Sequence, residues 1–198
     1  MPSRKSPYKG SDVLTQQAKK GGYPARSVFK LEEIDRRARL LRPGLHVLDL
    51  GAAPGSWSIY VAQKITSKGM LVAVDSRPLK ITLPSPHLFI PGNVFELSRE
   101  LLLPFAPYDL VLSDMAPSTT GSHLADQARS VELFLQALLF SDEFLRVGGS
   151  FVGKLLMGGD FPQARTAIRE RFEHEKIFRP EGTRRVSSEI FLVGFKRR

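Results

Sequence analysis

Short apolar runs alternate with longer helical patterns along most of this 198-residue chain. One helical pattern follows Gly55, and another runs from about Asp126 to Arg146 and is closed by Gly148-Gly149. A third runs from Asp160 to about Arg171. We expect strands at residues 45–50, 70–75, 87–90, 108–113, 150–155, 175–178 and 189–195. This alternation predicts the α/β class, with a mostly parallel sheet and helices on both of its faces.

The charge of the chain indicates its partners. It contains 29 Lys and Arg against 20 Asp and Glu, a formal net charge of +9, which favours nucleic acid over an acidic membrane surface. No cysteine is present, which excludes disulfides and thiolate zinc sites, and the scattered histidines predict no metal site. The sequence shows neither a membrane span nor the apolar stretch of a signal peptide, so we expect a cytoplasmic protein.

The N-terminal part divides into two segments. Residues 1–23 are basic and poor in aliphatic side chains, and we predict a mobile arm that is either a solubilising tail or a contact for RNA. From Pro24 onward, apolar residues recur at helical spacing and predict an amphipathic helix that Arg42-Pro43-Gly44 ends. The length and the hydrophobic content suit one domain, over residues 24–198.

Residues 47–57 run from an apolar strand into a turn of small residues, Gly51-Ala52-Ala53-Pro54-Gly55, and then into a helix. Glycine lets the backbone approach a ligand closely, and open α/β sheets bind ligands beyond the carboxyl ends of their strands. An ordinary strand-to-helix connection is the alternative. The turn is therefore a candidate cofactor loop.

Acidic residues indicate which cofactor this loop binds. Asp75 closes the next strand, where a carboxylate can accept hydrogen bonds from both hydroxyls of a ribose. Since the G-x-G-x-x-G fingerprint of nicotinamide enzymes is missing between Gly51 and Ser56, S-adenosylmethionine fits better than NAD. Asp49 either attracts the positive methionine end of that cofactor or caps the backbone of the turn.

The fourth expected strand ends in Ser113-Asp114-Met115-Ala116-Pro117, which places Asp114 at the carboxyl edge of the sheet. Enzymes that methylate base amino groups are expected to carry an aromatic ring here, for stacking on a flipped base. This segment has no ring, which favours an oxygen acceptor. A sugar hydroxyl is a poor nucleophile until its proton leaves, so the reaction needs a base.

Lys154 is the candidate base. A partly desolvated lysine beside a positive sulfonium holds its proton less tightly and can take one from a hydroxyl. In an apolar strand a charged side chain needs carboxylate partners, and Asp114 and Glu189 are the candidates that would orient Lys154, with Lys30 entering from the N-terminal helix. The alternative is a buried ion-pair cluster that only fixes the topology.

Five separated motifs occur in the order Arg26-Ser27-x-Phe29-Lys30-Leu31, Asp49-Leu50-Gly51-Ala52-Ala53-Pro54-Gly55-x-Trp57, Ser113-Asp114-Met115-Ala116-Pro117, Gly148-Gly149-Ser150-Phe151-Val152-x-Lys154, and Arg179-Pro180 through Arg184 to Ser187-x-Glu189. Their order and spacing resemble the FtsJ/RrmJ heat-shock methyltransferases from about residue 6 to the C-terminus. One departure is Asn93 after Gly92, where the family commonly has Asp. Asn93 can still accept one hydrogen bond from an adenine amino group.

The resemblance implies a Rossmann-like methyltransferase fold with a seven-stranded sheet whose last strand is antiparallel. It implies that a tetrad of Lys30, Asp114, Lys154 and Glu189 methylates a ribose 2′-hydroxyl, with S-adenosylhomocysteine as the second product. The implied substrate is a uridine in the A-loop of 23S-type large-subunit ribosomal RNA, within an assembled large ribosomal subunit. We expect a monomer that needs no metal.

The remaining expected contacts concern the cofactor and the RNA. The expected cofactor residues are Gly51, Ala53, Gly55, Trp57, Asp75, Asn93 and Asp114. The expected phosphate contacts are Lys9, Lys19, Lys20, Arg26, Arg179, Arg184 and Arg185.

Other functions stay open at this point. The same tetrad serves family branches that modify transfer RNA or messenger RNA caps. A chain with this fold can also act as a non-catalytic RNA-binding assembly factor, although the intact tetrad argues against it. A nicotinamide-dependent oxidoreductase is disfavoured because its fingerprint is missing. The compact chain, without an appended RNA-binding domain, favours the ribosomal branch.

Overall fold

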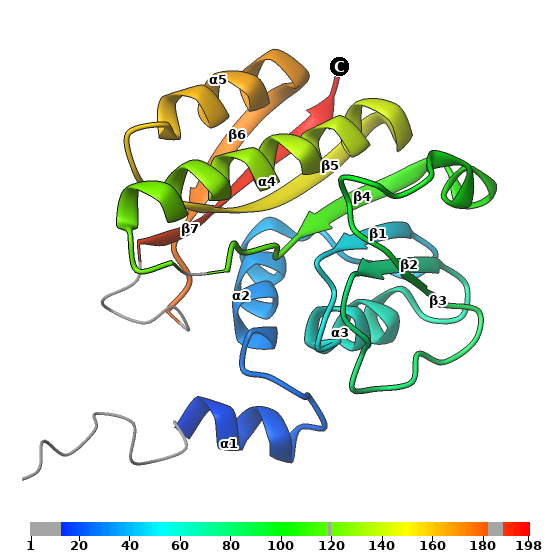
Figure 1. The fold of residues 1–198 in the computed structure, drawn as a ribbon. Helices are drawn as coiled ribbons and strands as arrows, with labels where there is room; N and C mark the ends of the chain where they lie inside the picture. Colours follow the sequence, from blue (N-terminus) through cyan, green and yellow to red (C-terminus); the bar gives the residue numbers. More distant parts are fainter. Residues whose placement is uncertain (1–12, 119, 182–187) are drawn as a thin grey trace, which may run out of the picture.

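The computed structural model describes residues 13–118, 120–181 and 188–198, which form a seven-stranded sheet in the order β3-β2-β1-β4-β5-β7-β6 (Figure 1). The strands are β1 (His46–Leu50), β2 (Met70–Asp75), β3 (Leu88–Pro91), β4 (Tyr108–Ser113), β5 (Leu145–Leu156), β6 (Phe172–Phe178) and β7 (Glu189–Arg197). The first five strands pair in parallel, and β7 is antiparallel to both β5 and β6. The predicted mostly parallel sheet with an antiparallel last strand is confirmed.

Helices cover both faces of this sheet, as predicted (Figure 1). One face packs against α2 (Val28–Ala38) and α3 (Ser56–Ile65), and the other packs against α4 (His123–Phe144) and α5 (Phe161–Arg171). Two short 3-10 turns, η1 (Arg99–Leu101) and η2 (Leu103–Phe105), precede β4. The central strands are apolar on both sides because each side is buried under helices. No helix within the described ranges is long and apolar enough to span a membrane.

A helix that the sequence did not predict, α1 (Val13–Lys20), lies in the segment expected to be a mobile arm. Ala18 is fully buried, and the Tyr23 hydroxyl donates to Gln63 in α3 at 2.9 Å. This part of the segment is therefore anchored, because one small side chain and a polar contact replace the missing aliphatic residues. The division into an arm over 1–23 and a domain over 24–198 stays a prediction.

Helix α2 ends before Arg42-Pro43-Gly44, the sequence that was expected to end it. Arg39 already has a left-handed φ of 53°. The buried carboxylate of Asp35 accepts hydrogen bonds at 2.8 to 3.0 Å from Leu40 N, Leu41 N and the Tyr60 hydroxyl. A side-chain acceptor near the end of a helix competes with the next helical turn. The periodicity of apolar residues does not contain this signal.

The junction of α4 and β5 also differs from the prediction. Gly148 and Gly149 were expected to close the helix, but they lie inside β5. The pairing between β4 and β5 shifts at this point, and Gly148 takes a φ of 76° that suits glycine. Beyond the shift, Ser113 pairs with Gly153. The residue after each of them, Asp114 and Lys154, is thereby brought to the same edge of the sheet.

Candidate active site at the carboxyl edge of the sheet

A cleft of about 520 Å³ opens at the carboxyl ends of the central strands. Its lining includes five of the predicted cofactor residues and the predicted base: Gly51, Ala53, Asp75, Asn93, Asp114 and Lys154. Ligands of open α/β sheets bind at this position, because the loops after parallel strands meet there. The structure therefore brings the small-residue turn, the strand-end carboxylates and the lysine into one cavity.

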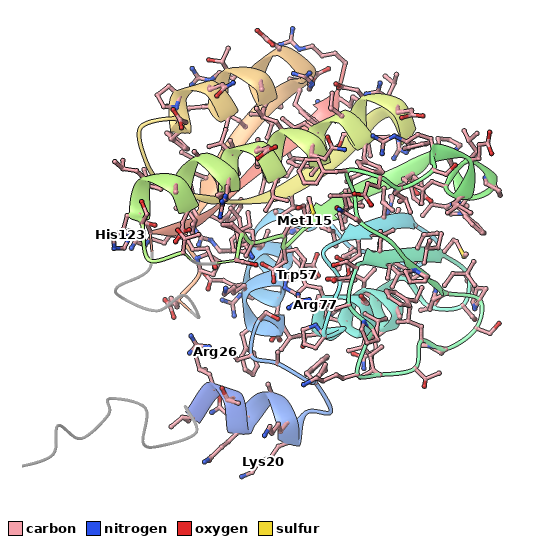
Figure 2. All side chains as sticks on the ribbon, in the orientation of Figure 1. Lys20, Arg26, Trp57, Arg77, Met115 and His123 are labelled. Atoms are coloured by element: carbon pink, nitrogen blue, oxygen red, sulfur yellow. The ribbon has the colours of Figure 1, made fainter. Side chains whose placement is uncertain are left out.

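The turn after β1 is held tightly against β2 and the end of β4. Gly51 has a φ of 79°, and a Cβ atom on it would lie 2.6 Å from the Met115 side chain. The N–H of Ala53 donates to Oδ2 of Asp75 at 2.8 Å. Figure 2 shows Met115 at the point where β4 ends. A glycine is required at residue 51 by both its backbone angle and its close neighbour.

The Asp75 carboxylate takes part in this packing and still faces the cleft. Its Oδ1 accepts the backbone N–H of Arg77 at 2.8 Å and lies 3.4 Å from Arg77 Nε. Because each carboxylate oxygen has two lone pairs, Asp75 can accept further hydrogen bonds from a ligand. Arg77 lines the cleft but was missed in the sequence, although its place two residues after Asp75 was a signal.

Two residues expected to bind the cofactor do not line the cleft. Gly55 packs on the following loop, since a Cβ atom on it would lie 2.5 Å from the Ile81 side chain. Trp57, which Figure 2 labels, is 2% exposed, and its indole N–H donates to the Ser27 carbonyl at 2.9 Å. The side chain of Trp57 therefore belongs to the core, and the glycine at residue 55 satisfies a packing requirement.

Asn93, the departure from the family pattern, lines the cleft after β3. Its Oδ1 accepts the backbone N–H of Phe95 at 3.2 Å. Asp and Asn both form this local turn, so the substitution leaves the backbone arrangement possible. The predicted hydrogen bond from an adenine amino group to the same oxygen stays a prediction.

The four tetrad residues form two ion pairs. Lys154 Nζ lies 2.9 Å from Oδ1 of Asp114 and also donates to the Asp114 backbone carbonyl. Lys30 Nζ lies 2.5 Å from Oε1 of Glu189. Lys154 is 7% exposed, and the other three side chains are 13 to 19% exposed. The expectation that both carboxylates contact Lys154 is therefore wrong for Glu189, which pairs with Lys30.

The two ion pairs lie on the same face of the sheet. Leu156 pairs with Glu189 and Lys154 pairs with Phe191 in the β5–β7 ladder. Opposite residues of an antiparallel pair share a face, and so do residues two apart on one strand. Helix α2 supplies Lys30 to that face, with its Nζ 5.9 Å from the centre of the Phe191 ring.

Asp49 lies fully buried beneath the cofactor loop. Its Oδ2 accepts a hydrogen bond from the Ser58 hydroxyl of α3 at 2.6 Å. Among the atoms that the structure describes, none donates to its Oδ1, and its Oδ2 binds α3 and not the turn. Of the two alternatives for Asp49, the one in which it caps the backbone of the turn is therefore wrong. Burial raises the pKa of Asp49 to about 7, and the negative charges of Asp114 and Asp75 act in the same direction.

The predicted phosphate contacts are only partly described. Lys19 and Lys20 end α1, and Arg26 precedes α2; Figure 2 shows Lys20 and Arg26 on the α1 side of the molecule. Arg179 follows β6, whereas Lys9, Arg184 and Arg185 lie outside the described residues. In the described part of the chain, no group of three or more His, Asp or Glu side chains is placed to hold a metal ion.

Comparison with known proteins gives consistent matches. The family model for FtsJ-like methyltransferases matches residues 23–197. The Ribosomal RNA large subunit methyltransferase E of Sorangium cellulosum (strain So ce56) is 57% identical over 194 residues, which cover 98% of this chain and 92% of that protein. The protein of the same name from Syntrophobacter fumaroxidans is 42% identical over 193 residues, which cover 96% and 98%.

A solved structure shares the fold. A Plasmodium falciparum protein named as a ribosomal RNA methyltransferase superposes with a TM-score of 0.75, over 88% of this chain and 98% of that one. The sequence identity is 24%, so this match shows the fold alone.

The raised pKa of Asp49 predicts a pH-dependent effect of Asp49→Asn on stability. As pH rises from about 4 to 7, the unfolded chain loses this proton before the folded protein does. The free energy of unfolding therefore falls over this range and stays at the lower value above pH 7. Asparagine keeps an acceptor for Ser58 without the charge. The variant should exceed the wild type in free energy of unfolding by roughly 2–4 kcal/mol at pH 8, and by less at pH 5.

Urea denaturation at both pH values measures this difference. Asp160→Asn removes one exposed negative charge whose side chain makes no helix-cap hydrogen bond, and serves as the control. An equal gain for Asp49→Asn at pH 5 and pH 8 would contradict the argument.

Proposed function

Because the chain belongs to the FtsJ-like methyltransferase family, we propose that it transfers the methyl group of S-adenosylmethionine to a ribose 2′-hydroxyl of RNA. The observation that supports this most is the Lys154–Asp114 pair, at 2.9 Å, in the wall of the cleft. A nearly buried lysine that borders a ligand cavity can act on a ligand. A lysine that only fixed the topology would not need to line the cleft, which argues against the purely structural alternative.

The residues around the cleft fit this cofactor. Asp75 has lone pairs left for the ribose hydroxyls, and Asn93 lines the cleft, where its Oδ1 could accept the adenine amino group. Asp49, whose buried Oδ1 accepts no hydrogen bond from a described atom, and the Asp114 carboxylate in the cleft both favour a positively charged group. When bound, S-adenosylmethionine supplies an electrophilic methyl group on a positive sulfur. Since Asp75 ends β2 and Lys154 lies in β5, the reacting end would face β4 and β5.

The chemical step follows from the two ion pairs. In its neutral form, Lys154 would take the proton of the 2′-hydroxyl as the oxygen bonds to the methyl carbon. The bond between this carbon and sulfur would break, and S-adenosylhomocysteine would leave. Asp114 accepts a hydrogen bond from Nζ and stabilises the resulting ammonium. Lys30, held by Glu189 on the same face, stabilises the developing alkoxide. Alignment of the oxygen with the methyl carbon provides the largest part of the acceleration.

Removal of the proposed base tests this mechanism. Lys154→Ala should bind S-adenosylmethionine with an affinity within a few-fold of the wild type, because the ribose and adenine contacts remain. Its methyl transfer should fall by about 10²–10⁴-fold, the usual contribution of a general base. Calorimetry measures the binding, and incorporation of tritiated methyl into RNA measures the transfer.

Lys68→Ala, an exposed lysine in the turn between α3 and β2, is the control and should keep full activity. Wild-type activity in Lys154→Ala would rule out Lys154 as the base.

We further propose that the substrate is a uridine in the A-loop of 23S-type ribosomal RNA, presented by the assembled large subunit. The names of the relatives support large-subunit ribosomal RNA. The net charge of +9 supports a polyanionic partner. The described residues form a single sheet with its helices, and we propose that the folded subunit provides much of the recognition surface.

Substrate competition tests this target. Incubation with tritiated S-adenosylmethionine and unmodified large subunits should label one uridine, and naked ribosomal RNA and transfer RNA should be labelled more slowly. Nuclease mapping of the labelled fragment identifies the nucleotide. Labelling of transfer RNA or of a messenger RNA cap in place of the subunit would move the chain to another branch, and no labelling at all would favour an assembly factor.

RNA phosphates are proposed to bind Lys19, Lys20, Arg26 and Arg179. Lys19 and Lys20 form the last turn of α1, and this helix precedes the segment that leads into α2 and Lys30. A phosphate backbone held there would lie near the helix that supplies Lys30. For Lys9, Arg184 and Arg185, the proposal rests on the sequence.

The double change Lys19→Ala with Lys20→Ala should weaken RNA binding most at low salt. The plot of log affinity against log salt should lose about one to two from its slope, because up to two phosphate contacts disappear. Filter binding between 50 and 200 mM salt, roughly the range over which such contacts weaken, provides the measurement. The double change Lys64→Ala with Lys68→Ala is the control and should keep the wild-type slope. A wild-type slope in the variant that lacks Lys19 and Lys20 would contradict the assignment.

A further inference from the structure

Trp57 connects the cofactor loop to the backbone of Lys30. It is the second residue of α3 and follows Gly55, the last residue of the loop, by two positions. Its indole N–H donates to the carbonyl oxygen of Ser27 at 2.9 Å. The same carbonyl accepts the backbone N–H of Lys30 at 3.1 Å. One oxygen atom therefore binds both the indole and the first turn of α2.

The Trp57 ring also supports the surface under the Lys30 ammonium. Its centroid lies 5.5 Å from the centroid of Phe191, and Lys30 Nζ lies 5.9 Å from the same Phe191 ring. Phe191 pairs with Lys154 across the β5–β7 ladder and lies two residues after Glu189. Trp57 thus contacts the backbone anchor of Lys30 on one side and the ring beneath its side chain on the other.

The start of α2 lacks a side-chain cap. Ser27 occupies the N-cap position with helical backbone angles, and its hydroxyl makes no cap hydrogen bond. Helices usually begin with a side-chain acceptor that fixes the first turn. The indole N–H is a donor and does not replace this acceptor, but it binds the Ser27 carbonyl to α3. A phenylalanine at residue 57 would fill the core without supplying that hydrogen bond.

We propose that Trp57 is a positioning residue that fixes Lys30 against Glu189. It thereby links the cofactor loop to the side of the site that would bind the RNA ribose. The proposal rests on the proposed function, since it assigns Trp57 a role through Lys30. It replaces the expectation from the sequence that Trp57 contacts the cofactor, because the buried indole does not line the cleft.

Trp57→Phe tests this role, because it keeps an aromatic ring and removes the N–H. The single-turnover rate of methyl transfer at saturating cofactor and RNA should fall about 10–100-fold, as expected for a displaced catalytic group. The dissociation constant for S-adenosylmethionine should change by less than about two-fold. Amide hydrogen exchange in the first turn of α2, residues 28–31, should accelerate relative to the wild type.

Tyr23→Phe is the matched control. It also removes one aromatic donor between the N-terminal segment and α3, the Tyr23–Gln63 bond at 2.9 Å, but it leaves the Ser27 carbonyl untouched. Its single-turnover rate should stay within about two-fold of the wild type, and exchange in residues 28–31 should not change. In a Lys30→Ala background, Trp57→Phe should lower the rate no further.

Three results would overturn the proposal. Weaker cofactor binding with an unchanged rate would make Trp57 a cofactor residue. An equal loss of rate with and without the Lys30 side chain would show that Trp57 does not act through Lys30. Unchanged amide exchange in residues 28–31 of Trp57→Phe would show that the indole N–H does not fix the start of α2. This readout works even where Lys30→Ala leaves no measurable turnover. Wild-type activity in Lys154→Ala is a separate result that overturns the proposed base, not this anchor.

Discussion

The ion pair between Lys154 and Asp114 is the constraint on which the rest of the site depends. Removing two charges from water is costly unless they meet in good geometry, so the ends of β4 and β5 must lie in one register. The irregular pairing around Gly148 sets that register. Asp114 directly follows β4, and the next residue, Met115, packs so closely on Gly51 that a Cβ atom on this glycine would lie 2.6 Å from its side chain. The same contacts therefore place the cofactor loop and the candidate base.

The direction of β7 completes the site. Since β7 runs antiparallel beside β5, its first residue lies next to the carboxyl end of β5. A parallel strand would place its last residue there instead. Glu189, which begins β7, is thus brought to the edge where the loops of the parallel strands meet, and α2 contributes Lys30 to the same face. Two short-range ion pairs from four separate elements then share one surface.

The sequence predicted the site residues whose place depends on the end of a strand. It missed the contacts that depend on which side chain meets which in the folded protein. Asp75 and Asp114 were predicted because carboxyl ends of parallel strands meet at one edge. The pairing of Glu189 with Lys30 was missed, since the sequence gives no distances between side chains of separate elements. The early end of α2 depends on Asp35 binding backbone groups several residues later. Trp57 resembled a ligand residue because a motif records that a residue recurs and does not record whether it packs or binds.

Charge is divided between the cleft and the outer surface. The chain is basic overall, yet Asp75 and Asp114 line the cleft and Asp49 lies beneath it. These carboxylates would attract the positive sulfur of S-adenosylmethionine, while Lys19 and Lys20 would attract phosphates. Methyl transfer removes the positive charge from sulfur, so S-adenosylhomocysteine loses that attraction to the carboxylates. Under the proposed function, the same carboxylates that favour binding of the donor would therefore favour its replacement after each turnover.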